Sequence, residues 1–205
     1  MRAPISAPWD LTPGLRRIPS DGLAREEPVI DHDRPDAVLI RAAREGSEPA
    51  LEALFHRYWK SALRDAYLVC QDRAGAEDVA QEAFLSAVRS LDRFDRRRPF
   101  GPWLHRIAVN RAIDWTRKRS VRAETAMASV PDNPAPPAPE SEPDVMAALA
   151  ELDVDHRAVI VLRYLYDLSP GEIAGALGLP RGTVNSRLRR GLDRLAVDLE
   201  AERVR

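Results

Sequence analysis

Near the end of the chain, two short helices are predicted together with their start and stop signals. Ser169 is a favourable N-cap, Pro170 suits the first helical position, and Glu172 is placed to return a hydrogen bond to the cap, which makes a capping box. Gly178 is expected to end this helix and Pro180 to begin the next. Because so short a connection constrains how two helices cross, the sequence predicts a helix-turn-helix.

The second of these helices has two different faces. Its apolar side, which we expect to be buried, is made of Val184, Leu188, Leu192, Leu195 and Leu199. The opposite arc carries Gly182, Thr183, Ser186, Arg189 and Arg190, with Asn185 at its edge. Short polar side chains and arginines of this kind suit base edges and phosphates in a DNA major groove. The alternative is a solvated basic face on an ordinary helical hairpin.

The composition fits an all-α protein of a reducing compartment. Aromatic residues make up 6% of the 205 residues and β-branched runs are scarce, which favours helices. Cys70 is the only cysteine and follows Leu68 and Val69, so we expect a buried small side chain. Since no apolar run approaches the ~20 residues of a membrane span and no signal peptide is evident, we expect a soluble, cytoplasmic protein without membrane insertion.

Prolines divide the chain into two helical parts. Four amphipathic segments precede a proline-rich stretch that is not expected to continue any helix, and two more precede the helix-turn-helix. The predicted fold is therefore all-α, with two small helical domains joined by a flexible linker. The predicted bounds are 1–35 for a disordered N-terminal extension, 36–119 for the first domain, 120–143 for the linker, 144–199 for the second domain and 200–205 for a C-terminal tail.

The third predicted helix, 74–94, carries a leucine on its polar side. Leu85 falls among Asp78, Gln81, Glu82, Ser86 and Arg89 on the helical wheel. The other half, expected to be buried, holds Val79, Ala80, Ala83, Phe84, Ala87, Val88 and Leu91. A single exposed leucine is common and needs no special cause. A leucine ringed by charged groups is also how an anchor for a partner protein looks.

The fourth predicted helix and the loop before it combine positive charge with aromatic surface. A net charge of −1 hides basic clusters at Arg96–Arg98 and Arg117–Arg119. Phe100 offers a ring on which an unpaired base can stack. The alternative is that Phe100, Trp103 and Trp115 are core residues, which we expect for the two tryptophans. Along the helix, a stripe suited to DNA is formed by Arg106, Asn110, Ile113 and Arg117.

Signals of catalysis or of a bound metal are missing from the sequence. It contains no phosphate-cradling glycine loop and no nucleophile elbow. The four histidines, His32, His56, His105 and His156, do not fall at metal-ligand spacing. We therefore expect no enzyme, no metal, no cofactor and no small-molecule substrate, and we expect His105 and His156 on helix surfaces.

Two stretches carry a family resemblance. AEDVAQEAFLSAVRSLDRFD with FGPWLHRIAVNRAIDWTRKR, and later the helix-turn-helix, resemble the extracytoplasmic-function (ECF) group of bacterial sigma factors. The family's region 2 corresponds to residues 36–119 and its region 4 to residues 144–199. Residues 1–35 have no counterpart in the minimal two-region architecture. The resemblance implies a protein that binds core RNA polymerase and directs promoter-specific transcription initiation.

The resemblance also implies roles for individual residues. The helix matching 76–94 docks on polymerase, which implies polymerase-binding roles for Asp78, Gln81, Glu82, Leu85 and Arg89. The loop and helix matching 95–119 open the −10 element, which implies contacts from Arg96, Arg97, Phe100, Arg106, Asn110, Ile113, Arg117 and Lys118. The last helix reads the −35 element, which implies base contacts from Asn185, Ser186, Arg189 and Arg190 and phosphate contacts from Arg181, Thr183 and Arg187.

The expected partners follow from the same resemblance. They are core RNA polymerase, promoter DNA as duplex and as melted strand, and an anti-sigma factor, which commonly holds members of the family. The alternative function is a stand-alone helix-turn-helix regulator, which explains the C-terminal half but leaves Leu85 and Asn110 without a role. Specific initiation with core polymerase distinguishes the two.

Overall fold

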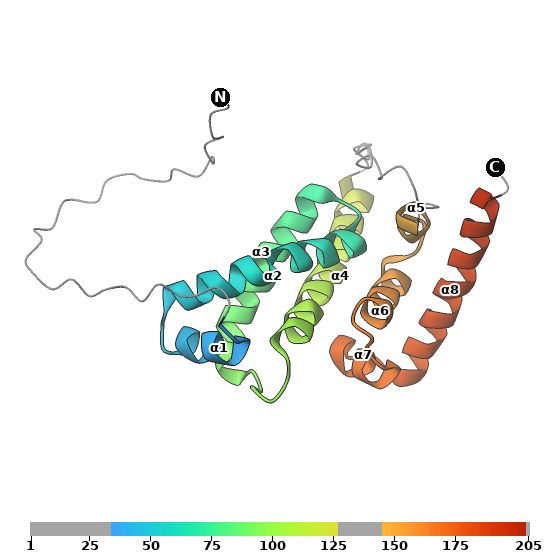
Figure 1. Cartoon of the computed structure of the whole chain (residues 1–205). Coiled ribbons are helices and arrows are strands. Elements are labelled where there is room, and N and C mark those ends of the chain that lie inside the picture. Colours follow the sequence, from blue (N-terminus) through green and yellow to red (C-terminus); the bar gives the residue numbers. More distant parts are fainter. Residues whose placement is uncertain (1–33, 127–144, 204–205) are drawn as a thin grey trace, which may run out of the picture.

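The computed structural model of the chain describes residues 34–126 and 145–203, and almost all of them are helical. Two helical bodies lie side by side, one made of α1–α4 and the other of α5–α8 (Figure 1). The N-terminal body contains α1 (Asp36–Arg44), α2 (Glu48–Cys70), α3 (Arg73–Ser90), the 3-10 turn η1 (Leu91–Arg93) and α4 (Phe100–Ala126). The C-terminal body contains α5 (Val145–Ala150), α6 (Val154–Tyr164), α7 (Pro170–Leu177) and α8 (Arg181–Arg203). The all-α prediction is confirmed.

The N-terminal body is built around the mutual packing of α2, α3 and α4. Leu54, Phe84 and Leu104, one from each helix, are buried in a single apolar cluster. α1 adds Leu39 and Ile40 to the same cluster. Burying each such side chain contributes about 1.5–3 kcal/mol, so these contacts hold the four helices together.

The start of the loop that precedes α4 is held in place by hydrogen bonds from α1. The Arg44 guanidinium, at the end of α1, donates to the Leu91 carbonyl at 2.6 Å and to the Phe94 carbonyl at 2.7 Å. Phe94 is itself buried. Because both ends of η1 are tied to α1, the basic residues that follow are presented at a defined edge of the body.

The start of α3 fits closely against α4. Gly75 lies directly under the Trp115 ring, since a Cβ at that position would come within 2.2 Å of the ring. Asp72 N-caps α3 by accepting from the Gly75 amide at 2.7 Å, and it also pairs with Arg119 of α4. Burial alone would raise the pKa of Asp72, but the Gly75 amide and Arg119 outweigh it, and the pKa is lowered.

The C-terminal body packs α6 and α7 against α8. Ile173 and Val184 are fully buried between α7 and α8, as the predicted apolar faces require. α6 and α8 approach closely at Gly191, where a Cβ would lie 2.7 Å from the Ile160 side chain. The helix-turn-helix therefore packs against α6, which supports it within the C-terminal body.

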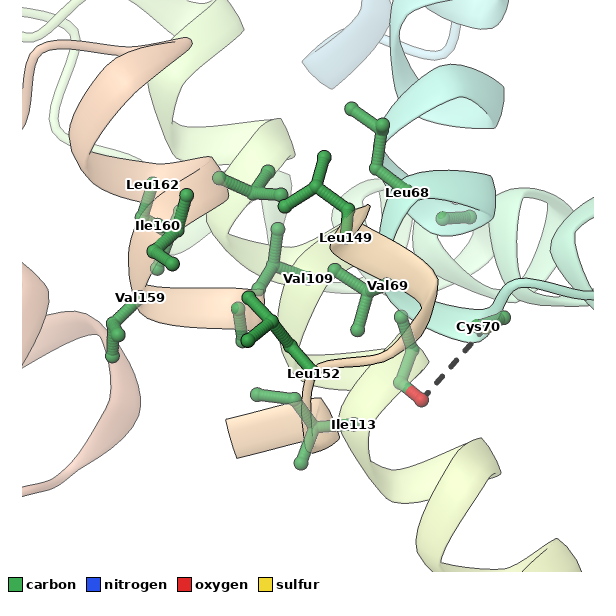
Figure 2. Close-up of a cluster of buried hydrophobic side chains, with 14 of the residues drawn as sticks. Leu68, Val69, Cys70, Val109, Ile113, Leu149, Leu152, Val159, Ile160 and Leu162 are labelled. Carbon is green, nitrogen blue, oxygen red and sulfur yellow. Dashed lines mark hydrogen bonds between the residues drawn. The ribbon is translucent and has the colours of Figure 1, made fainter. Parts of the chain in front are cut away.

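A single apolar cluster joins the two bodies. Figure 2 shows Val69 of α2 and Val109 and Ile113 of α4 meeting Leu149 and Leu152 from the C-terminal body. Val159 and Leu162 of α6 belong to the same cluster. Cys70 is buried in the same cluster, as the predicted buried position requires, and burial raises the pKa of its thiol to about 12. The two bodies thus share a core, which the sequence did not predict.

Three expectations about the helices are wrong. α4 continues to Ala126, into the stretch expected to be linker, because residues 120–126 contain neither proline nor glycine. Val88 is 45% exposed at the rim between α2 and α3. Leu192 is 38% exposed, although Gly191 beside it packs against α6 and Leu195 packs against the apolar cluster. Residues 1–33 of the extension predicted at 1–35, and most of the predicted linker, lie outside the described residues.

Candidate nucleic-acid and protein-binding surfaces

The helix-turn-helix has the cap and turn predicted for it. The Glu172 amide donates to the Ser169 hydroxyl at 3.3 Å, and the Ser169 amide donates to the Glu172 carboxylate at 2.9 Å. The Ser169 hydroxyl and amide lower the pKa of Glu172 because they stabilise its charged form. Gly178 adopts φ +64°, which ends α7 and favours glycine. The backbone therefore aims α8 away from α7 at a defined angle.

The outer arc of α8 presents the side chains expected to contact DNA. Arg181, Asn185, Arg189 and Arg190 are exposed, and Thr183 and Ser186 are half-buried. The Ser186 hydroxyl donates to the Thr183 carbonyl at 2.9 Å, so it has a partner within the helix. Arg187 points a different way and pairs with Asp155 of α6 at 2.8 Å. The arc is thus a mixture of exposed donors and one guanidinium that already has a partner.

The polar side of α3 carries an apolar groove next to its charged residues. Leu85 is 51% exposed, as expected. It lines an open groove of about 460 Å³ between α2 and α3, whose other walls are Leu51, Glu52, Phe55, Gln81, Phe84 and Val88. Asp78 and Arg89 are exposed around it, and Arg89 lies 3.5 Å from Glu82. An apolar hollow with a charged rim suits a protein partner.

The loop before α4 is basic but offers no aromatic ring. Arg96, Arg97 and Arg98 are exposed, and Arg97 makes a bidentate contact with Asp95 that lowers the pKa of the carboxyl. Phe100 is only 3% exposed. Its ring packs between Tyr58, Phe94 and Trp103 with centroid separations of 5.2, 5.7 and 5.5 Å. The expectation that Phe100 is available to stack on a base is therefore wrong. The alternative, that Phe100 is a core residue, is confirmed.

The stripe predicted along α4 faces the C-terminal body. The Asn110 amide donates to the Ala176 carbonyl of α7 at 2.9 Å, and Arg117 pairs with Asp155 of α6 at 2.7 Å. Ile113 is buried in the shared apolar cluster. After the hydrogen bonds from Ser169, the charge of Arg106 also lowers the pKa of Glu172 at the start of α7. In this arrangement Ile113 is covered and Arg106 and Asn110 are half-buried, whereas Arg117 and Lys118 remain exposed.

A buried polar group that the sequence did not reveal also crosses between the bodies. Asp65 of α2 is fully buried, lies 2.5 Å from His105 of α4 and accepts from the Tyr166 hydroxyl. The Tyr166 ring stacks on His105 with centroids 4.1 Å apart. Burial, and then Asp65, raise the pKa of Tyr166. His105 is buried, so its expected surface position is wrong, and half-buried His156 lies against α8.

Arg157 is a second polar group at this junction that sequence analysis missed. It is buried in α6 and donates to the Val69 carbonyl of α2 at 2.9 Å and to the Leu152 carbonyl at 2.5 Å. Burial lowers the pKa of its guanidinium. No local pattern marks Arg157 or Asp65 as a junction residue, because Val69 and Tyr166, their partners across the junction, lie far away in the sequence.

The described residues contain neither a cluster suited to a metal ion nor a helix suited to span a membrane. Within 34–126 and 145–203, no group of three or more histidine, cysteine or acidic side chains is arranged to hold a metal. In the same part of the chain, every helix is too short or too polar to cross a bilayer.

Comparison with known families assigns both parts of the chain. Residues 54–122 match the family model for sigma-70 region 2, and residues 144–195 match the model for sigma-70 region 4. The first match covers most of α2, all of α3 and nearly all of α4. The second covers α5, α6 and α7 in full and most of α8.

Relatives and solved structures agree with that assignment. The chain is 34% identical over 166 residues to the ECF RNA polymerase sigma factor SigM of Mycobacterium tuberculosis, covering 80% of this chain and 85% of SigM. It is 32% identical over 176 residues to SigW of Bacillus subtilis, covering 78% of this chain and 94% of SigW. It is similar to CnrH, solved in complex with the cytosolic domain of CnrY, with 31% identity, a TM-score of 0.57, and coverage of 81% and 97%. The sigma factor RpoE of Bartonella quintana, solved with the anti-sigma factor NepR, shares the fold at 24% identity and a TM-score of 0.62, with coverage of 73% and 96%.

Proposed function

Because the chain belongs to the ECF family of bacterial RNA polymerase sigma factors, we propose that its separate surfaces bind core polymerase, the −35 element and the −10 element. The observation that carries this division is the chemistry of the surfaces. An apolar groove with a charged rim lies on α2 and α3, and a donor-rich arc lies on α8. A stand-alone regulator needs only the donor-rich arc on α8.

The polymerase-binding surface is the groove around Leu85. Leu85 and Val88 are large apolar side chains that remain half exposed on a helix whose other face is buried. Docking removes this area from water, and Asp78, Gln81, Glu82 and Arg89 at the rim set the orientation of the partner. In this proposal Leu85 is the anchor.

The −35 surface is the outer arc of α8. Asn185, Arg189 and Arg190 are exposed and suit base edges. Arg190 and half-buried Ser186 border a hollow that α8 forms with the start of α6. Arg181, Thr183 and Arg187 suit phosphates, which fix the register of the helix in the groove. Because the capped turn positions the start of α8 and α6 packs closely against it at Gly191, α8 enters the major groove as a rigid unit.

The −10 surface combines the basic loop with α4. Arg96, Arg97 and Lys118 are exposed and supply charge for the DNA backbone. The stripe of Arg106, Asn110, Ile113 and Arg117 supplies contacts for a melted strand once the C-terminal body has moved away. Holding a flipped base offsets a few kcal/mol of unstacking, which favours strand opening without hydrolysis. The chain therefore needs no catalytic residue, and polymerase performs the chemistry.

An anti-sigma protein is the expected regulator. CnrH and RpoE, which this chain resembles, were both solved with a bound protein partner, and NepR is named as an anti-sigma factor. Since polymerase acts in the cytoplasm, we place this chain there as well.

Transcription with purified components tests the proposal. The chain is mixed with core polymerase and a library of genomic fragments, and the 5′ ends of the transcripts are mapped. We expect starts at a small set of sites with a shared upstream element. Asn110→Ala should reduce permanganate reactivity at the −10 element more than it reduces binding to the duplex. Promoter binding without any specific initiation would instead identify a stand-alone regulator.

A further inference from the structure

We propose that Arg44 of α1 is a positioning residue for the −10 surface, because it fixes the start of the basic loop 95–99 and so places that loop for strand opening. The inference deepens the proposed function and rests on it, since it gives a role to α1, which carries none of the binding surfaces proposed above. It is supported by the bonds that Arg44 makes, by the construction of the loop, and by the contacts of α1 with both ends of the loop.

The Arg44 guanidinium holds three carbonyl groups where η1 ends and the loop begins. Its Nη2 lies 2.6 Å from the Leu91 oxygen, 3.0 Å from the Asp92 oxygen and 2.7 Å from the Phe94 oxygen. Its Nε also donates to the Leu91 carbonyl, at 2.9 Å. The last carbonyls of a helix lack a partner within the helix, and a cation beside them is favourable. Because a guanidinium presents its donors in a rigid planar fork, it fixes the three carbonyls relative to α1.

The loop itself is a turn between two buried aromatic residues. Phe94 precedes it and Phe100 follows it, and their ring centroids are 5.7 Å apart. Within the loop, the Asp95 carbonyl accepts from the Arg98 amide at 2.9 Å, and the Asp95 carboxylate accepts from the Arg97 amide at 3.1 Å. Since these bonds lie inside the loop, its position on the body is set where the two aromatic residues enter the core.

α1 contacts both ends of this loop. At the C-terminal end of α1, Arg44 bonds to the Phe94 carbonyl. At its N-terminal end, the Asp36 carboxylate accepts from the Tyr58 hydroxyl, and the Tyr58 ring packs on Phe100 with centroids 5.2 Å apart. The first contact is direct, whereas the second acts through the Tyr58 ring. Replacing Arg44 therefore frees the start of the loop while its end stays packed.

The position of the loop matters when the duplex opens. Arg96 and Arg97 are exposed and supply charge for the phosphates of the −10 element. Capture of a flipped base competes with restacking, which is worth a few kcal/mol, and a loop that is correctly placed in only a fraction of chains weakens capture by that fraction. Freeing the loop should therefore impair opening, whereas binding to core polymerase and to the −35 duplex uses other surfaces and should not change.

Two variants of the full-length chain and one matched control test the inference. Arg44→Gln removes the guanidinium and its charge. Arg44→Lys keeps the charge, but a single ammonium group on a flexible stem does not fix three carbonyls as the planar fork does. Arg41→Gln is the control, because Arg41 is exposed in the same last turn of α1 and its replacement changes the net charge equally.

The loop is measured first by hydrogen exchange, without DNA or polymerase. The Phe94 amide bonds to the Leu91 carbonyl at 3.1 Å, and the Arg98 amide bonds to Asp95, so both amides report on the segment 91–99. Arg44→Gln should speed exchange in this segment about tenfold, and Arg44→Lys should do so by a smaller factor, with exchange in α2 unchanged. Exchange in 91–99 equal to that of Arg41→Gln would overturn the proposal.

Initiation is measured next with core polymerase on two copies of one promoter, a full duplex and a copy whose −10 segment is mismatched. On the duplex, Arg44→Gln should yield first transcripts about tenfold more slowly than Arg41→Gln, and Arg44→Lys should also be slower. On the mismatched copy the difference should shrink to within about twofold, because that strand does not restack. Affinities for core polymerase and for a −35 duplex should match the control.

Three results would overturn the positioning role. Equal rates for Arg44→Gln and Arg41→Gln on the duplex would show that Arg44 does not act in opening. Equal losses on both copies would identify a residue that only supports the fold. The parent rate in Arg44→Lys would show that charge suffices without the fork. Failure of the proposed function looks different, because the parent chain would then give no specific transcript on either copy, while hydrogen exchange would still report whether Arg44 holds the loop.

Discussion

Replacing Leu85 by arginine is the perturbation that most clearly separates a docking role from a packing role. Leu85 is 51% exposed in the groove between α2 and α3. Full burial of a leucine contributes about 1.5–3 kcal/mol, so docking that covers the remaining half contributes about 0.8–1.5 kcal/mol. With arginine at this position, the complex loses this apolar contribution. Docking must also bury a charge, which costs several kcal/mol when the partner provides no opposite charge.

The expected loss of affinity for core polymerase is therefore at least about a hundredfold, since 1.4 kcal/mol corresponds to a factor of ten. The fold should change little, because the aliphatic part of arginine can lie over the groove while its guanidinium stays in water. We expect the free energy of unfolding to fall by less than about 1 kcal/mol.

Two measurements are needed for this variant. Fluorescence anisotropy of the labelled chain titrated with core polymerase gives the dissociation constant, and circular dichroism during urea unfolding gives the stability. Leu192→Arg is the matched control, because Leu192 is 38% exposed on α8 and lies far from the groove. An affinity for polymerase equal to that of the control would refute the anchor role. A large loss of stability in parallel with the loss of binding would show that Leu85 is a packing residue.

Three further outcomes are expected. Gly75→Ala should lower the free energy of unfolding by about 1–3 kcal/mol in urea melts, because its Cβ would meet the Trp115 ring at 2.2 Å; an unchanged midpoint would contradict that close packing. The pKa of Asp72 is lowered in the folded chain, so its stabilising effect is present above the ordinary value of 3.8 and is lost as the pH falls through the folded pKa. Stability curves measured from pH 6 downward should therefore fall more steeply for the parent than for Asp72→Asn, and parallel curves would contradict this. Arg189→Ala should cost about 1–3 kcal/mol of discrimination between a promoter and a version altered in its −35 element; equal discrimination would remove Arg189 from the base-reading set.

The helices and the capped turn were predictable because their signals are local. Ser169, Glu172 and Gly178 lie within ten positions of one another, and their hydrogen bonds form inside one supersecondary unit. Leu85 was also predictable, because helical periodicity alone places it opposite the buried face. Such signals need no knowledge of the rest of the fold.

The junction between the bodies was not predictable for the opposite reason. Tyr166 and Asp65 are 101 positions apart, and neither carries a local sign of the other. Phe100 and His105 follow a basic loop and fit a surface position by sequence, but Phe94, Tyr58 and Tyr166 cover them in the fold. Aromatic residues beside charge are ambiguous until the packing of distant helices is known.

Footprinting of the chain with core polymerase on a mapped promoter tests whether two surfaces of one chain bind two separate DNA elements. We predict protection of an upstream segment and, one to two helical turns downstream, permanganate-reactive thymines in a melted segment, about 35–70 Å apart along the duplex. Arg189→Ala should lose the upstream protection first, and Asn110→Ala should lose the melted segment first. A single protected segment that forms equally well without polymerase, and that never melts, would contradict a sigma factor and leave only a DNA-binding helix-turn-helix.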